Sequence, residues 1–200
     1  GFYLIRENSR RLSLKTVANG NIEETCQALL HALKIIQIYH RNEMTLGGIS
    51  VGLIKRGDDN SYYLQDPLVI NHLWKSLEPE YQIERPAEVI EGNGWSQEAD
   101  IFSWGAVAYY LLTGTEAYPA AAQEDKTAKI LRGSVIALND HKPEISPALN
   151  KLIISCLNKN TLKRPKVENL ISELTKLMES QMVTISEAEA KKLQEKAGLN

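Results

Sequence analysis

Apolar residues recur every three or four positions along much of the chain, which is the spacing of amphipathic helices. The clearest case is residues 22–41, where Asn21 followed by Glu24 also matches an N-terminal capping sequence. Three later stretches show the same spacing, at about 121–132, 147–157 and 166–179. The pattern therefore predicts a mainly helical protein.

A different pattern marks residues 99–112, which are apolar on nearly every side of a helix. Ser96 before this stretch and Gly114 after it are residue types that commonly begin and end helices. A helix that is apolar all round needs neighbours on every side, so we expect it to be the most buried helix. Asp100 near its start then requires hydrogen bonds, which we expect from residues 46–49.

Short strands are expected in the N-terminal half of the chain. Residues 2–6 predict one strand, and a polar stretch with no predicted element follows it. Two apolar runs, 53–54 and 62–64, flank residues 57–60, whose composition is typical of a tight turn. These runs predict a β-hairpin. At the other end of the chain, residues 183–200 are polar and predict a separate helix or linker.

Composition narrows the functional classes. The chain has 200 residues, 43% of them hydrophobic, and 23 basic against 25 acidic residues give a net charge of −2. This balance argues against nucleic acid or an anionic membrane as a partner. No run approaches the roughly 18 apolar residues of a membrane-spanning helix. Cys26 and Cys156 are far apart and form no metal-binding pair, which favours a reducing, cytoplasmic location.

Candidate chemical residues are few. Gly47, Gly48 and Gly52 lie close together, but their spacing matches no phosphate-binding loop, and a tight turn before the hairpin is the simpler interpretation. The four histidines show no zinc-ligand spacing and are expected to be surface or helix-packing residues: His31, His40, His72 and His141. The residues therefore predict neither a metal site nor a bound cofactor.

The order of several short motifs is more informative than any one of them. Pro86-Ala87-Glu88 is followed by Asp100 at the start of the apolar helix, and Arg164-Pro165 precedes the last amphipathic stretch. This order resembles the C-terminal lobe of the protein kinase family. The resemblance implies structural roles for Glu88, Asp100 and Arg164, with Glu88 and Arg164 forming a mostly buried ion pair.

The resemblance also assigns the residues between the first helix and the hairpin. The family's His-Arg-Asp triplet falls on Leu46-Gly47-Gly48, its magnesium-binding Asn on Leu53, and its Asp-Phe-Gly triplet on Asp66-Pro67-Leu68. A rival register puts the first triplet on His40-Arg41-Asn42, but the hairpin would then begin too late. Phosphoryl transfer needs a carboxylate that orients the attacking hydroxyl and ligands for magnesium. Gly48 and Leu53 offer neither, whereas Asp66 retains a carboxylate.

The resemblance covers about residues 2–180 and divides the chain into three parts. Residues 1–20 resemble the last strand of the N-terminal lobe and the hinge, residues 21–180 form the helical lobe, and residues 181–200 are a linker or helix. The implied fold is mainly α: a protein kinase-like C-terminal lobe with a short β-hairpin. The N-terminal lobe is expected to be largely absent.

The missing chemical groups imply a pseudokinase-like module, a non-catalytic domain that acts in protein–protein interaction, scaffolding or regulation. Its expected partner is another protein or another domain of the parent chain. The expected interaction surface consists of apolar residues at the former catalytic positions: Leu46, Ile49, Leu53, Pro67 and Leu68. An inward fold of this loop is the structural alternative. Two functional alternatives stay open: a divergent serine/threonine kinase whose N-terminal lobe lies upstream, and a regulatory domain whose neighbour carries the activity.

Overall fold

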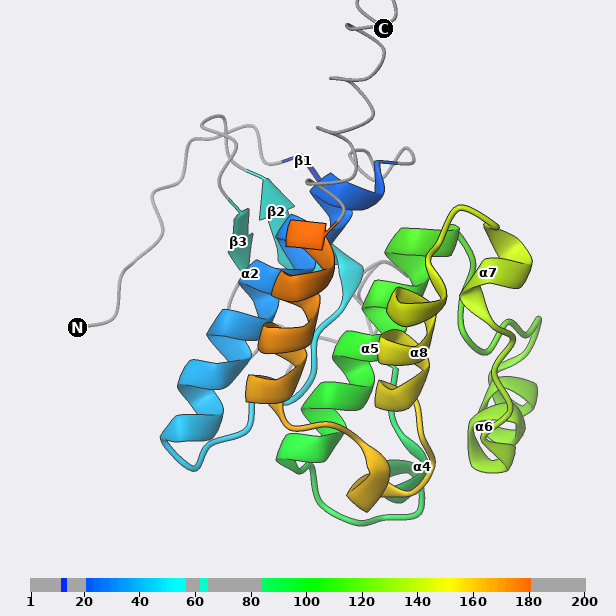
Figure 1. Ribbon diagram of the computed structural model, residues 1–200. Coiled ribbons are helices and arrows are strands. Elements are labelled where there is room, and N and C mark those ends of the chain that lie inside the picture. The colour runs from blue at the N-terminus through cyan, green and yellow to red at the C-terminus, as the bar shows by residue number, and fades with distance from the viewer. Residues whose placement is uncertain (1–11, 14–20, 57–61, 65–83, 181–200) are drawn as a thin grey trace, which may run out of the picture.

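The molecule is mainly helical, as the sequence predicts. A computed structural model covers all 200 residues. It describes residues 12–13, 21–56, 62–64 and 84–180. The helices gather around one central helix, shown in green in Figure 1. Several predictions lie outside the described residues, namely the strand at 2–6, the turn at 57–60, the segment 183–200, and Asp66, Pro67 and Leu68.

The first long helix, α2 (Ile22–Arg41), begins where the capping sequence predicts. The side chain of Asn21 accepts a hydrogen bond from the amide of Glu24 at 3.2 Å, which satisfies one of the amides left unpaired at a helix start. The helix ends at Asn42, whose side-chain amide donates to the carbonyl of Ile38 at 2.7 Å. Local capping chemistry thus defines both ends of α2.

The central helix is α5 (Gln97–Thr113), and it is buried along almost its whole length. Ser96 caps its start by accepting a hydrogen bond from the amide of Ala99 at 3.2 Å. Gly114 ends it with φ of +76°, the left-handed conformation that glycine adopts without strain. The prediction of a buried central helix between Ser96 and Gly114 is therefore confirmed.

A small antiparallel sheet lies beside α2. It contains β1 (Leu12–Ser13), β2 (Ile54–Arg56) and β3 (Tyr62–Leu64), in that order across the sheet. Ile54 pairs with Leu64, and Leu12 pairs with Arg56. The predicted hairpin is confirmed by β2 and β3. The sequence pattern missed β1, because two residues within a polar stretch are too few to show an alternating pattern.

The remaining helices follow α5 or precede it closely. They are α4 (Ala87–Ile90), α6 (Gln123–Arg132), α7 (Leu138–His141), α8 (Pro147–Cys156) and a last helix over 167–180. The three long ones match the predicted amphipathic stretches. The pattern missed α4 and α7, because four residues form little more than one turn and show no helical period. None of the helices in the described part of the chain has the length and hydrophobicity of a membrane-spanning segment.

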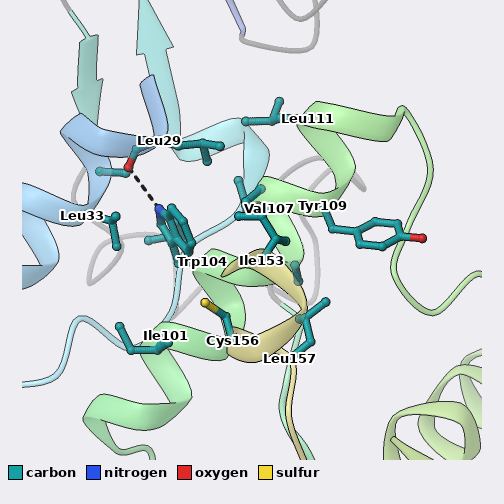
Figure 2. Packing of buried hydrophobic residues seen from close by; sticks show 14 of the residues in the cluster. Leu29, Leu33, Ile101, Trp104, Val107, Tyr109, Leu111, Ile153, Cys156 and Leu157 are labelled. Carbon is teal, nitrogen blue, oxygen red and sulfur yellow. Dashed lines mark hydrogen bonds between the residues drawn. The ribbon is translucent and has the colours of Figure 1, made fainter. Parts of the chain in front are cut away.

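The core forms where α5 passes between α2 and α8. Figure 2 shows Trp104 of α5 directed toward Leu29 and Leu33 of α2, and its indole Nε1 donates to the Leu29 carbonyl at 3.1 Å. On the α8 side, Gly105 lets the two helices approach closely, because a Cβ placed there would lie 2.6 Å from the Cβ of Cys156. These contacts hold the middle of α5 between α2 and α8, and the candidate site lies about one turn earlier in the same helix.

Candidate functional site

The loop between α2 and β2, which carries the positions matched to the catalytic triplet, lies against the first turn of α5. Asp100 is fully buried there. Its Oδ2 accepts a hydrogen bond from the amide of Leu46 at 2.7 Å, and its Oδ1 accepts one from the amide of Gly48 at 2.9 Å. The expectation that residues 46–49 satisfy Asp100 is therefore confirmed.

Two ring nitrogens complete the environment of this carboxylate. The indole Nε1 of Trp95 donates to Oδ1 of Asp100 at 2.7 Å, and Nε2 of His40 lies 3.0 Å from Oδ2. Because an ionised carboxylate only accepts hydrogen bonds, His40 donates through Nε2. Each oxygen thus receives two hydrogen bonds, which offsets the cost of burying the charge. Sequence reasoning missed the role of His40, whose partner lies 60 positions away.

A hydroxyl group extends this contact along α5. Oγ of Ser103 accepts a hydrogen bond from the amide of Ile49 at 3.0 Å and donates to the carbonyl of Asp100 at the same distance. Three backbone amides of the loop, at Leu46, Gly48 and Ile49, are therefore bound to side chains of one helix. The loop has a fixed conformation set by the start of α5.

The interaction surface expected from the sequence is wrong for the residues that the structure describes. Leu46, Ile49 and Leu53 are at most 1% exposed. The physical reason is the attachment of the loop to Asp100 and Ser103, which holds its backbone against α5 and its apolar side chains in the interior. All three are core residues, as the inward-folding alternative predicts. Pro67 and Leu68 are not tested.

The loop carries little chemistry of its own. Gly48, at the position matched to the catalytic aspartate, is buried and has φ of +88°. Leu53, at the position matched to the magnesium-binding asparagine, is an aliphatic side chain with 0% exposure. Oγ of Ser50 is buried and has no hydrogen-bond partner among the described residues. The loop is thus suited to holding a conformation and lacks proton acceptors and metal ligands at these two positions.

The second expected structural site is the pair of Glu88 and Arg164. Nη1 of Arg164 donates to Oε1 of Glu88 at 2.5 Å, and Nη2 donates to Oε2 at 3.0 Å. This ion pair joins α4 to the turn before the last helix, as the resemblance implies, and its expected presence is confirmed.

A charge cluster that sequence reasoning missed lies beside α4. Nζ of Lys126 in α6 is 2.6 Å from Oε1 of Glu84 and 3.1 Å from Oε2 of Glu116. Burial raises the pKa of the Glu84 carboxyl although Lys126 opposes the shift. Burial is the largest single effect on Lys126 and lowers its pKa, but the charges and hydrogen bonds of Glu84 and Glu116 together outweigh it and the net pKa is raised. The three residues come from separate loops and a helix, so no sequence spacing connects them.

These contacts can now be compared with known proteins. A family model described as the protein kinase domain matches residues 80–191, more than half of the chain. The chain belongs to the protein kinase domain family. Its helices form the C-terminal lobe of that fold, with Glu88 of α4 and Asp100 of α5 inside the matched region. The family recognised from the motif order is therefore confirmed.

Three curated relatives show the extent of the similarity. The serine/threonine-protein kinase Nek8 of Danio rerio is 32% identical over 85 residues, which is 42% of this chain and 12% of that protein. The probable serine/threonine-protein kinase ireA of Dictyostelium discoideum is 28% identical over 154 residues, 72% of this chain and 14% of that protein. The inactive serine/threonine-protein kinase PLK5 of Mus musculus is 29% identical over 86 residues, 43% of this chain and 14% of that protein. The matches thus cover only 12–14% of the length of these relatives.

Proposed function

We propose that this kinase lobe does not transfer phosphate and that it acts by binding another protein or another domain of its parent chain. The observation that carries the proposal is the conformation of Gly48, at the position matched to the catalytic aspartate. Its φ is +88° and its amide is bound to Asp100. A residue with a side chain is strained in this conformation. The loop therefore favours glycine at the position where phosphoryl transfer needs a carboxylate.

The position matched to the magnesium-binding asparagine supports the same proposal. Magnesium prefers oxygen ligands, and the buried side chain of Leu53 has none. Within the described ranges, no three His, Cys, Asp or Glu side chains are grouped so that they could hold a metal ion. Asp66 lies outside those ranges and is the residue on which magnesium binding would depend.

The contacts that hold the lobe together are retained while the chemical positions have changed. Glu88 still binds Arg164, and Asp100 still binds the loop. A lobe that keeps its fold but lacks these reactive groups is suited to binding. One relative, from Mus musculus, is described by its name as inactive, so the similarity includes a kinase-like protein described as lacking activity.

The proposal is tested by nucleotide binding and phosphate transfer. The purified chain is titrated with ATP, with and without magnesium, while its melting temperature is measured. It is then incubated with ATP labelled at the γ-phosphate and a general acceptor protein. We expect no magnesium-dependent shift and no labelling. A shift of several degrees, or labelling that Asp66→Asn abolishes, would contradict the proposal.

A second candidate function is phosphoryl transfer by a divergent serine/threonine kinase whose N-terminal lobe lies upstream. It is favoured by the relatives from Danio rerio and Dictyostelium discoideum, which are named as kinases. This candidate requires Asp66 to bind magnesium and another residue to replace the carboxylate missing at Gly48. It therefore predicts that Asp66→Asn removes magnesium–ATP binding, whereas the first proposal predicts no binding to remove.

A further inference from the structure

Leu162 is the most exposed large apolar side chain in the described part of the chain, with 91% of its surface accessible. It is the middle residue of η4 (Thr161–Lys163), the gold turn between α8 and the last helix at the lower edge of Figure 1. The other exposed large apolar residues are 50–60% exposed: Ile38, Met44 and Ile136. Single exposed apolar residues are common, so the backbone and the charges around Leu162 decide whether it is a contact residue.

The backbone that presents Leu162 is fixed by hydrogen bonds. Oδ1 of Asn160 accepts from the amide of Leu162 at 3.0 Å, and the carbonyl of Asn160 accepts from the amide of Lys163 at 3.0 Å. Immediately after the turn, Arg164 is buried and bound to Glu88. A turn that is already ordered loses little entropy on binding. Leu162 is therefore presented on a preorganised support.

Several positively charged residues lie close to Leu162 in the sequence. The segment 145–167 contains no Asp or Glu, and it contains Lys151, Lys159, Lys163, Arg164 and Lys166. Arg164 is neutralised by Glu88. Nζ of Lys159 donates to the carbonyl of Leu131 at 2.7 Å. In contrast, Lys163 and Lys166 are exposed, and no ion pair joins them to a carboxylate of the described residues. The turn thus presents one apolar side chain close in sequence to two lysines that form no ion pair, although the whole chain is slightly acidic.

We propose that Leu162, Lys163 and Lys166 form a docking surface, the Leu162 surface, for an acidic segment of another protein. The lysines attract carboxylates of the partner and speed association. Leu162 inserts into an apolar recess of the partner and acts as the anchor that slows dissociation. This surface goes beyond the absence of phosphoryl transfer proposed above and does not depend on it.

An anionic membrane fits the Leu162 surface less well than an acidic protein segment. Each lysine near such a membrane contributes only about 1 kcal/mol. One leucine adds little, since even a whole myristoyl chain gives marginal membrane binding. An acidic segment instead brings several carboxylates to fixed positions around the lysines, so its binding is both stronger and dependent on the turn geometry.

The experiment selects the partner chemistry without assuming a sequence. The full chain is immobilised and exposed to a displayed library of random short peptides. The selected peptides are synthesised, and their dissociation constants are measured by fluorescence anisotropy. We expect peptides that combine several Asp or Glu residues with one apolar residue. Leu162→Gln should weaken their binding about tenfold or more.

Charge reversal gives an independent readout. Lys163→Glu combined with Lys166→Glu should weaken the same peptides by about tenfold at low salt, and less at high salt because the charges are screened. That variant should in turn bind peptides whose acidic residues are replaced by lysine. Ile136→Gln is the matched control, since Ile136 is also exposed but lies outside the surface, and it should leave binding unchanged.

The possible results of these binding measurements either support or overturn the proposed docking surface. All of these variants change exposed side chains, so their melting temperatures should match that of the parent chain. Selection of peptides without acidic residues, unchanged binding by Leu162→Gln, or Leu162-dependent binding to phosphatidylserine vesicles in place of peptides overturns the proposal. The phosphate-transfer assay is scored separately, so failure of the docking surface and failure of the proposed function are distinguishable.

Discussion

Arg164 binds the carboxylate of Glu88 through two parallel hydrogen bonds that bridge 76 positions of the chain. The same guanidinium donates to the carbonyls of Glu98 and Asn158, at 3.0 and 2.8 Å, and lies 5.0 Å above the ring of Phe102. The Arg164 side chain is 0% exposed and the Glu88 side chain 15%. One arginine thus connects α4, the start of α5 and the end of α8.

Removing one member of this pair should destabilise the lobe strongly. Arg164→Ala leaves the Glu88 carboxylate partly buried without a partner and leaves two backbone carbonyls unpaired. Such losses typically cost about 3–5 kcal/mol. Urea unfolding followed by circular dichroism measures the free energy of unfolding. Arg164→Lys should recover only part of the loss, because an ammonium group does not form two parallel hydrogen bonds with one carboxylate.

The matched control is the exposed pair of Lys176 and Glu173, with an Nζ–Oε1 distance of 3.0 Å on the last helix. Exposed pairs contribute about 0–1 kcal/mol, so Glu173→Ala should change stability very little. If Arg164→Ala were as mild as Glu173→Ala, the interior role of the Glu88 pair would be wrong.

Substitution of Asp100 should also lower the stability of the folded lobe, for a different reason. All four groups that face its oxygens are hydrogen-bond donors, including the amides of Leu46 and Gly48. Asp100→Asn replaces one oxygen by an amino group, which then faces two donors. We expect a loss of about 2–4 kcal/mol. Hydrogen exchange should also speed up at the Leu46 and Gly48 amides. Asp125→Asn, at an exposed position of α6, is the control and should leave both quantities unchanged.

The long helices were predictable because their signals are local. Asn21 and Ser96 cap helices through amides three positions away, and Gly114 ends α5 through its own backbone conformation. The buried position of α5 followed from composition alone, since no orientation of an all-apolar helix leaves a polar face for water. The resemblance added the contact between Glu88 and Arg164, which no periodicity could connect across 76 positions.

The loop between α2 and β2 was predicted less well, because a loop has no periodicity that shows which way its side chains point. Leu46, Ile49 and Leu53 look like a surface patch in the sequence and are core residues in the structure. Their direction is set by hydrogen bonds to Asp100 and Ser103, which are tertiary contacts. The same limit applies to His40, whose role exists only once α2 and α5 are packed together.

Because α5 and α8 are in close contact at Gly105, a larger residue at this position should lower the stability of the fold. In Gly105→Ala the new methyl group would lie 2.6 Å from Cβ of Cys156 and 3.3 Å from Cδ2 of Leu157. The helices α5 and α8 must then separate, at a cost of about 1–3 kcal/mol, which exceeds the helix-propensity gain of up to about 1 kcal/mol. Gly94→Ala is the control, since nothing lies within 4 Å of a Cβ there. Equal melting temperatures for the two variants would contradict the close packing.

The buried thiols predict a loss of stability at alkaline pH. Burial raises the pKa of Cys26 and Cys156 from 9.0 to about 12. Below pH 9 both thiols are protonated in the folded and unfolded states, so they cause no pH dependence. Above pH 9 the unfolded chain loses these protons while the folded chain keeps them, and stability falls as pH rises. Between pH 8 and pH 10 the two thiols together should reduce the free energy of unfolding by about 2–3 kcal/mol.

The variant Cys26→Ala with Cys156→Ala isolates this effect. Its absolute stability changes because two side chains become smaller, so the decisive quantity is the slope of unfolding free energy against pH from urea titrations at pH 8, 9 and 10. We expect a steep decline for the parent chain and a shallower one for the variant. The variant still declines toward pH 10, because burial also raises the pKa of Tyr109 and Tyr118 above the ordinary tyrosine value of about 10. A thiol reagent at pH 8 provides a second measurement. Cys156 donates its thiol hydrogen to the Leu152 carbonyl at 3.4 Å and is fully buried, so reaction should require unfolding and should follow the urea transition. Rapid labelling of either thiol in the folded chain, or parallel pH profiles for parent and variant, would show that the thiols do not titrate from the interior.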